Sequence, residues 1–149
     1  MTPSRAAVVI DTAAAAAIAE AAERAYPDEA CGLLIGRGGD AGWRVTRAIV
    51  GTNVHPEPRR RFEVDPRLVF EWMRKLRGCD EALVGHFHSH PDGAAEPSAT
   101  DRESAYDRGA LWIIASVAQG RVGALRAFRL DPGGGTFAEV PLQVESVPG

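Results

Sequence analysis

Three of the four histidines of this chain, His86, His88 and His90, alternate with other residues in one short segment. The apolar residues before them predict a β-strand, on which side chains two positions apart share a face. Two imidazoles on one rigid strand can bind a divalent metal, and Asp101 can fold back to supply an oxygen ligand. Two His and one carboxylate leave a coordination position open. An open position is typical of catalytic zinc, because water bound there has a lowered pKa.

A helix start follows the histidine segment. Pro91 lacks a backbone donor and therefore ends the strand close to the metal-binding side chains. Ser98 fits the N-cap position of a helix that has Asp101 in its first turn. On local spacing alone a catalytic role for Ser98 is as good an interpretation as capping, because both place its hydroxyl at the mouth of the helix.

Two separate motifs resemble the JAMM (MPN+) metalloproteases. His88-x-His90-Pro91, followed six residues later by Ser98-x-x-Asp101, resembles the metal motif of that family. The segment 27–36 resembles the upstream segment that carries the family's glutamate, and Asn53 and residues 61–66 also resemble short bacterial members. The resemblance covers nearly the whole chain. It implies the MPN fold, a cytidine-deaminase-like α/β architecture with a mixed, largely antiparallel β-sheet flanked by helices.

The resemblance also implies a metal and its ligands: one Zn²⁺ per chain, bound by His88, His90 and Asp101. The period of the strand leaves an alternative open, because His86 shares the ligand face. A site of three histidines would then leave Asp101 without a bond to the metal. The family uses the later two histidines, so we interpret His86 as a supporting or core residue.

The same resemblance assigns the acid–base chemistry. Glu29 is expected to take a proton from the attacking water and to pass it to the leaving amine. Asp28 is the neighbouring alternative, but the family pattern places the acid two residues after Pro27, which selects Glu29. Ser98 is expected to donate a hydrogen bond to the tetrahedral oxyanion. Cys31 lies two residues from Glu29 and is interpreted as a small buried residue rather than as a thiolate ligand.

The implied activity is hydrolysis of a peptide or isopeptide bond after the Gly-Gly tail of a ubiquitin-like protein. The short bacterial members resemble peptidases that process sulfur-carrier proteins of the ThiS/MoaD type. Two alternatives remain: a partner-binding MPN scaffold without catalysis, and a zinc peptidase that acts on small peptide or amino-acid conjugates. The scaffold is disfavoured because all five motif residues are present. A nucleobase deaminase is disfavoured because the Pro-Cys-x-x-Cys signature is absent.

A Pro-rich, basic segment at residues 53–61 predicts a loop. We hypothesise that Arg59, Arg60 and Arg61 contact either the acidic surface of the partner or a product carboxylate. A solvated run of charge is the simpler interpretation. His55 in the same loop is interpreted as a solvated turn residue.

Composition limits the other possibilities. A length of 149 residues, with 45% hydrophobic and 25% charged residues, predicts a single domain over residues 1–149. A net charge of −3 gives no general attraction to nucleic acid or anionic membrane. No apolar run approaches the roughly 18 residues of a membrane span, and charged residues interrupt the Ala-rich start, so the expected location is the cytoplasm. Cys31 and Cys79 are expected to be reduced and buried. The sequence leaves the oligomeric state open.

Periodicity and turn signals predict strands in pairs separated by helices. A helix over residues 66–77 carries Leu68, Val69, Trp72, Met73 and Leu76 at the spacing of one buried face. The other expected helices lie at 12–25 and from 98 to about 108, and the expected strands at 6–10, 30–36, 43–52, 62–64, 81–90, 111–117, 122–130 and 137–144.

Overall fold

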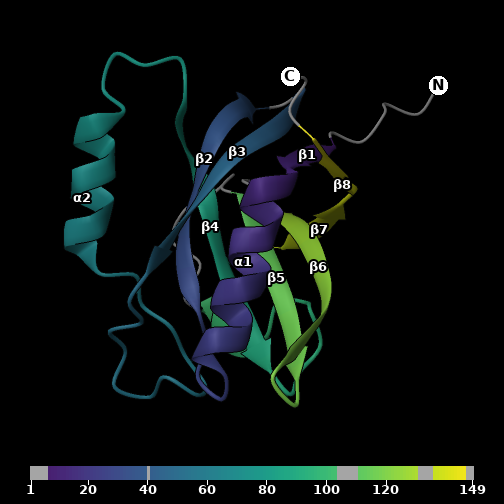
Figure 1. The fold of residues 1–149 in the computed structure, drawn as a ribbon. Coiled ribbons are helices and arrows are strands. Elements are labelled where there is room, and N and C mark those ends of the chain that lie inside the picture. Colours follow the sequence, from purple (N-terminus) through teal and green to yellow (C-terminus); the bar gives the residue numbers. More distant parts are fainter. Residues whose placement is uncertain (1–6, 40, 104–110, 131–135, 147–149) are drawn as a thin grey trace.

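The computed structural model describes residues 7–39, 41–103, 111–130 and 136–146 (Figure 1). In chain order its elements are β1 (Val8–Asp11), α1 (Thr12–Ala25), β2 (Cys31–Gly39), β3 (Gly42–Gly51), α2 (Pro66–Lys75), β4 (Ala82–Pro91), α3 (Ala99–Glu103), β5 (Leu111–Ala118), β6 (Arg121–Leu130), β7 (Phe137–Val140) and β8 (Leu142–Glu145).

The strands form one sheet in the order β7-β6-β5-β4-β2-β3-β1-β8. Strand β4 lies inside this sheet, antiparallel to β2 and parallel to β5. Strand β1 is parallel to both of its neighbours, β3 and β8. The three remaining pairs, β2–β3, β5–β6 and β6–β7, are antiparallel. The predicted fold class, a mixed and largely antiparallel sheet flanked by helices, is confirmed.

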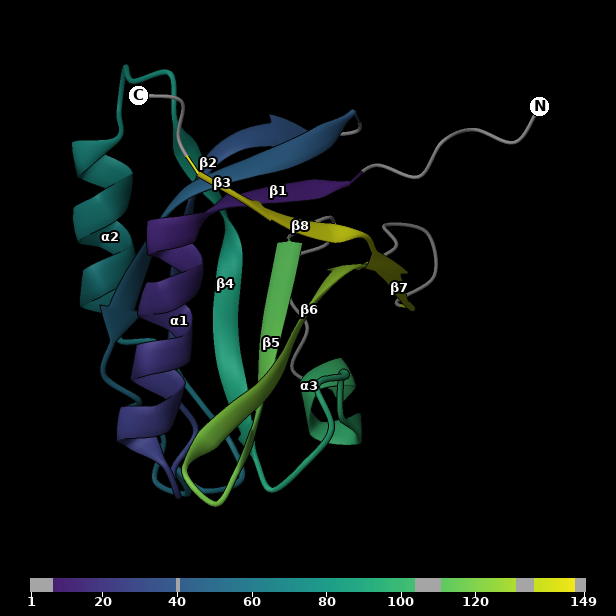
Figure 2. The same ribbon diagram turned by 45° about the vertical axis from the view of Figure 1, so that its right-hand side comes forward.

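The main core lies between α1 and one face of the sheet (Figure 1). The alanines of α1 favour helix and keep the helix surface narrow, so Ile18 is fully buried against the strands. On β5, Ile113 and Ala115 face this core, whereas Trp112 and Ile114 belong to a second cluster. Figure 2 shows α3 on the other side of β5 from α1. The sheet therefore has a core face and a second face, toward which α3 lies.

Helix α2 does not have the buried apolar face that the sequence predicts. Its start is as expected, because Asp65 accepts a hydrogen bond from the Arg67 backbone N–H and Pro66 follows the cap. Most of its apolar stripe is not core: none of the residues Pro66–Lys75 is buried, Met73 and Phe70 are 55% and 65% exposed, and of the stripe only Leu76 at the C-cap is buried. Figure 1 shows the reason, since α2 lies at the side of the sheet and not on the face that α1 covers.

The single strand predicted at 137–144 is two strands that pair with opposite ends of the sheet. Strand β7 pairs with β6, and β8 pairs with β1. Pro141 separates them because it cannot donate to a ladder, and its carbonyl accepts a bond from Val8 N–H at 2.8 Å. The strand predicted at 62–64 is only an isolated bridge between Asn53 and Val64. The predicted end of the third helix lies outside the described residues.

The two cysteines have different environments. Cys31 is buried and free, as predicted. Cys79 is also free but exposed, because it follows Gly78 in the turn after α2, so its predicted burial is wrong. Within the described ranges, no helix has both the length and the apolar character that a membrane crossing requires.

Candidate metal centre and active site

Strand β4 carries the three histidines on the second face of the sheet. His86 lies beside Trp112 in the register with β5, and His88 lies beside Ile114. Trp112 and Ile114 belong to the second cluster, on the face of the sheet opposite α1. His88 is fully buried inside the sheet, and His90 is partly exposed close to the carboxyl end of β4. The chain leaves the sheet at that end to form the loop before α3, so His90 faces the loop and helix that follow it.

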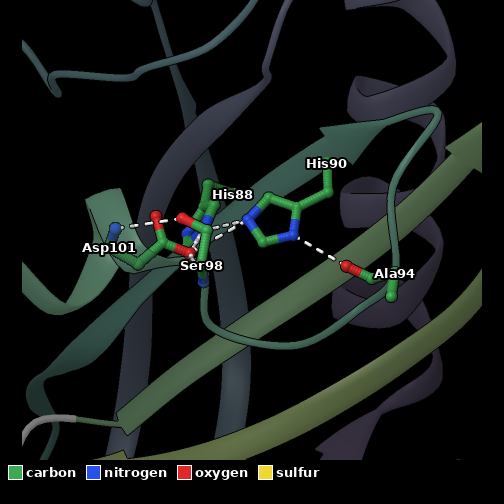
Figure 3. A network of polar contacts seen from close by, with 5 residues as sticks. All are labelled: His88, His90, Ala94, Ser98 and Asp101. Atoms are coloured by element: carbon green, nitrogen blue, oxygen red, sulfur yellow. Dashed lines mark hydrogen bonds and ion pairs between the residues drawn. The ribbon is translucent and has the colours of Figure 1, made fainter.

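Helix α3 brings the carboxylate of Asp101 to these rings (Figure 3). The Asp101 backbone N–H donates to Ser98 Oγ at 3.0 Å, and Ser98 N–H donates to Asp101 Oδ2 at 2.9 Å. This reciprocal pair is the arrangement of a capping box, with Asp in place of Glu. The capping interpretation of Ser98 is thus confirmed. The cap fixes the Asp101 side chain, because both its backbone and its carboxylate are bound to Ser98.

Three Lewis-basic atoms converge at this point. Asp101 Oδ2 lies 3.1 Å from His88 Nε2 and 3.0 Å from His90 Nε2, and the two nitrogens are 3.1 Å apart. Zinc–ligand bonds of about 2.0–2.1 Å put the ligands of a tetrahedral zinc roughly 3.3 Å apart. The triangle therefore has nearly the size that such an ion requires.

The protonation of His90 strengthens this fit. Its Nδ1 lies 2.8 Å from the Ala94 carbonyl oxygen, which can only accept, so Nδ1 carries the proton (Figure 3). In the neutral ring Nε2 is then a lone pair that faces an ionised carboxylate and a second imidazole. Such a cluster calls for a positive charge at its centre. Donation of the other ring N–H to a backbone carbonyl is also usual for a metal-binding histidine.

The electrostatics keep Asp101 ionised and His88 neutral, the states in which these groups can bind a metal. Burial opposes ionisation of Asp101, but hydrogen bonds from His88 and His90 outweigh it and hold the pKa of that carboxyl well below its usual range. Burial lowers the pKa of His88, so this ring is neutral. For His90, burial is outweighed by the hydrogen bond that the protonated ring donates to Asp101, so its pKa is raised and the ring is more readily protonated when no metal is bound.

Glu29 reaches the same place through the pairing of β2 with β4. Cys31 lies opposite His88, and continuing this register by two residues puts Glu29 opposite His90. The pairing does continue, because Ser89 N–H donates to the Ala30 carbonyl at 3.0 Å and Ala30 N–H donates to Ser89 Oγ at 2.7 Å. Ser89 therefore helps to position Glu29, a role that the sequence did not indicate.

The carboxyl of Glu29 is buried but not bonded to the triangle. One of its oxygens lies within 4.8 Å of a nitrogen of each of His88 and His90, and its Oε1 has no hydrogen-bond partner. Burial raises the pKa of Glu29 to about 8. Asp101 is closer to both rings, so it suits the role of ligand. Glu29 lies further from the two rings and has an oxygen without a hydrogen-bond partner. It therefore suits the role of a residue that acts on a molecule bound beside the metal.

His86 lies deeper along β4. Its ring is 4.3 Å from that of Trp112 and 5.2 Å from that of Phe62, and its Nε2 is buried without a partner. Burial lowers the pKa of His86 to about 3, so the ring is neutral. The triangle does not include it, which agrees with a supporting residue. Phe62 also stacks on His88, with 4.3 Å between the ring centroids, a contact that no sequence pattern indicates.

Cys31 does not join the cluster either. The thiol is buried, and desolvation raises its pKa to about 12, so it stays protonated. Its sulfur lies 3.9 Å from the Glu63 carbonyl oxygen. A protonated thiol in this setting is a packing residue.

The loop between β3 and α2 is tied to Glu29 through Asn53. The Asn53 amide nitrogen donates to the carbonyls of Glu29, Pro58 and Arg61 at 3.1, 3.4 and 2.9 Å. Its oxygen accepts from the backbone N–H groups of His55 and Glu63, both at 3.1 Å. The Asn53 side chain thus holds both ends of the loop together through five hydrogen bonds. An Asn in a Pro-rich loop is a turn signal, but its five partners could not be read from the sequence.

A cleft of about 370 Å³ opens over the candidate site. Side chains of the motif and of the basic loop share its walls, and its lining is Glu29, Arg59, Arg60, His90, Pro91, Gly93, Ala94, Glu96, Ser98 and Thr100. Glu29 and His90 therefore line one cleft together with the basic loop.

The fold and site define a class of protein, and comparison with known families gives the same one. Residues 11–131 match the family described as prokaryotic homologs of the JAB domain. This match covers most of the chain, so the protein belongs to the prokaryotic JAB family of JAMM-type hydrolases. The resemblance seen in the sequence motifs is confirmed.

Three relatives have named activities. A desampylase of Haloferax volcanii is 40% identical over 91 residues, which cover 60% of this chain and 63% of the relative. A CysO-cysteine peptidase of Mycobacterium bovis is 33% identical over 83% of this chain and 81% of its own. A probable TtuB-protein conjugate cleaving protease of Thermus thermophilus is 34% identical over 74% of this chain and 67% of its own.

Two solved structures share the fold. The solution structure of a Desulfitobacterium hafniense protein has a TM-score of 0.82 and 26% identity, and covers 94% of both chains. That of a Salinibacter ruber protein has a TM-score of 0.69 and 34% identity, and covers 91% of this chain and 90% of the other. Both proteins therefore share the α/β fold of this chain.

Proposed function

We propose that this protein is a zinc-dependent peptidase that cleaves the bond after the Gly-Gly tail of a ubiquitin-like sulfur-carrier protein. The observation that carries the proposal is the triangle of His88 Nε2, His90 Nε2 and Asp101 Oδ2, with edges of 3.0–3.1 Å, beside a buried and unsatisfied Glu29 carboxyl. Zn²⁺ bound by these three atoms would supply Lewis-acid activation of water at near-neutral pH.

Glu29 is the acid–base group in this proposal. Its carboxyl has no competing hydrogen bond at Oε1, and its pKa of about 8 lies close to the working pH of most enzymes. This pKa would fall toward neutrality beside a bound Zn²⁺, and a carboxyl with a near-neutral pKa can both accept and return a proton. Glu29 takes the proton of the attacking water and then gives it to the leaving amine.

Ser98 is proposed to stabilise the oxyanion. Its oxygen accepts from the Asp101 N–H, so its own hydroxyl proton remains free to be donated toward the cleft that Ser98 lines. Capping and catalysis are thus compatible. The loss of one such donor typically lowers kcat by about 10²–10³.

The substrate class is supported by the relatives and by the cleft. The three relatives are named for conjugates or adducts of small proteins. A cleft of about 370 Å³ with glycine and alanine among its lining residues suits an extended tail without bulky side chains. We therefore propose a Gly-Gly-tailed carrier as the partner.

Hydrolysis of a ubiquitin-like carrier extended beyond Gly-Gly tests the proposal. Wild-type protein supplied with zinc is expected to release the extension, and Glu29→Gln to lower kcat by about 10²–10⁴ while it keeps the metal, because only the proton acceptor is lost. Product formation is followed by mass spectrometry and zinc content by elemental analysis. Wild-type turnover in Glu29→Gln would contradict the assigned base, and an inactive wild type with bound zinc would contradict the substrate.

A further inference from the structure

Two cations on the cleft wall have no role in the function proposed so far. Arg59 and Arg60 are exposed and line the cleft together with Glu29, His90 and Ser98. Within the part of the chain that the structure describes, neither side chain has an ion pair or a hydrogen bond, although the charge of Arg59 acts on the pKa of Tyr26, whose hydroxyl donates to Asp92. Two free guanidinium groups beside the reactive groups are an anion-binding arrangement.

The next arginine provides a contrast. Arg61 does not line the cleft, and its Nε lies 3.8 Å from Glu57 Oε2. A solvated run of charge would have no reason to differ between adjacent residues in this way. The distinction between Arg61 and its two predecessors therefore argues that the loop presents a particular pair of charges to the cleft.

The backbone on each side of the pair is anchored. Glu29 N–H donates to the Pro58 carbonyl at 2.7 Å, directly before Arg59. The Asn53 amide donates to the Arg61 carbonyl at 2.9 Å, directly after Arg60. The two arginines thus occupy a short segment whose ends are fixed, and one end is bonded to the residue that carries out the proton transfer. Their place relative to the scissile bond is set by the fold.

The local charge balance favours an incoming carboxylate. Glu96 also lines the cleft, but no ion pair joins it to Arg59 or Arg60 among the described residues; its carboxylate lies 3.8 Å from the guanidinium of Arg126 on β6, which also binds Glu139. Arg59 and Arg60 therefore keep their capacity for another anion. Guanidinium forks bind carboxylates through paired, charge-assisted hydrogen bonds. The surface of a folded partner would not enter a cleft of about 370 Å³, whereas the end of a chain would.

We propose that Arg59 and Arg60 bind the free α-carboxylate of the residue or short peptide released from the carrier's tail. This inference rests on the proposed function and narrows its substrate class. Water adds to the last glycine carbonyl, the C–N bond breaks, and the amine leaves with the proton from Glu29. Substrates with a free carboxyl terminus just after Gly-Gly are preferred to isopeptide conjugates, which have no carboxylate at that position.

A matched pair of substrates tests the inference. A ubiquitin-like carrier ending in Gly-Gly-Ala is prepared as the free acid and as the C-terminal amide, and kcat/KM is measured for both with zinc-loaded protein. Wild type is expected to prefer the acid by about 10- to 100-fold, the range of charge-assisted hydrogen bonds. The double variant R59A/R60A is expected to bring this ratio close to one, mainly through KM. R61A is the control from the same loop and should keep the wild-type ratio.

The outcomes separate the inference from the function on which it rests. An acid-to-amide ratio near one in wild type, or a preference that survives in R59A/R60A, would overturn the inference and leave the peptidase assignment intact. An equal loss on both substrates in R59A/R60A would instead indicate a contact with the body of the carrier. Failure of wild type to cleave either substrate would refute the proposed function and the inference with it. Unchanged zinc content in R59A/R60A verifies that the site is intact.

Discussion

Burial gives Glu29 properties that an exposed glutamate does not have. Only 5% of the residue is exposed, and its pKa is raised from 4.5 to about 8 because desolvation penalises the charged form. Between these two values the folded state without metal holds a proton that the unfolded state has released. The free energy of unfolding of the metal-free protein must therefore fall as the pH rises from 4.5 to about 8.

This linkage gives a test at the residue scale. In the presence of a chelator, Glu29→Gln should remove the contribution of Glu29 to the pH dependence, because glutamine does not titrate. The stability of wild type relative to Glu29→Gln is expected to decline between about pH 4.5 and about pH 8. Urea unfolding of both proteins across this range measures the difference, to which His90 also contributes because its pKa is coupled to Glu29. A constant difference would show that the pKa of Glu29 is not raised.

The ligand residues show what spacing alone can predict. The alternation on a strand correctly put His88 and His90 on one face, and the cap motif correctly put Asp101 beside Ser98. The same alternation could not separate His86 from the others. What separates His86 is its depth along β4: its Nε2 is buried without a partner, whereas His88 and His90 both reach Asp101 Oδ2. The catalytic and ligand roles themselves stay predictions.

At the scale of elements, the loop between β3 and α2 depends on one side chain. Asn53→Ala removes bonds to five backbone groups, including the Glu29 carbonyl. We expect a loss of about 1–3 kcal/mol in the free energy of unfolding and a lower kcat, because the segment that holds Glu29 loosens. Urea unfolding measures the loss of stability, and hydrolysis of the carrier measures kcat. Hydrogen exchange of the Glu29 amide, which donates to Pro58, measures the loosening of the segment.

Val54→Ala is the matched control for this loop. Val54 is 41% exposed, and its backbone bond to Glu63 does not need the side chain. The control should stay within about 0.5 kcal/mol of wild type. If Asn53→Ala were as stable and as active as Val54→Ala, the loop would not be organised by Asn53.

Helix α2 shows where elements escape prediction from sequence. Periodicity located this helix and its Asp65 cap well, since both signals are local. The same apolar period predicts a core face, yet α2 lies beside the sheet and Phe70 is 65% exposed. Trp72 is instead covered by the guanidinium of Arg47 at 5.1 Å and the ammonium of Lys75 at 4.6 Å. The spacing of apolar residues shows that a helix is amphipathic. Which surface its apolar face contacts depends on the tertiary structure.

At the scale of the molecule, the site depends on contacts distant in sequence. The antiparallel register of β2 and β4 brings Glu29 to His90, and no local pattern contains that register. The family resemblance supplied it instead, and with it the fold class. Pro141 similarly signalled an interruption, but not that β7 and β8 pair with opposite ends of the sheet. The expectation of one domain over residues 1–149 stays a prediction, as does the cytoplasmic location.

The central claim is that His88, His90 and Asp101 hold a catalytic zinc. Elemental analysis of purified wild type, His88→Ala and Asp101→Ala, with hydrolysis of a Gly-Gly-extended carrier measured on the same samples, tests it most directly. One zinc per wild-type chain is expected, with metal and cleavage lost together in both variants, because each removes one of three ligands around an otherwise open site. Stoichiometric zinc retained by both variants, or none in wild type after zinc is supplied, would contradict the claim.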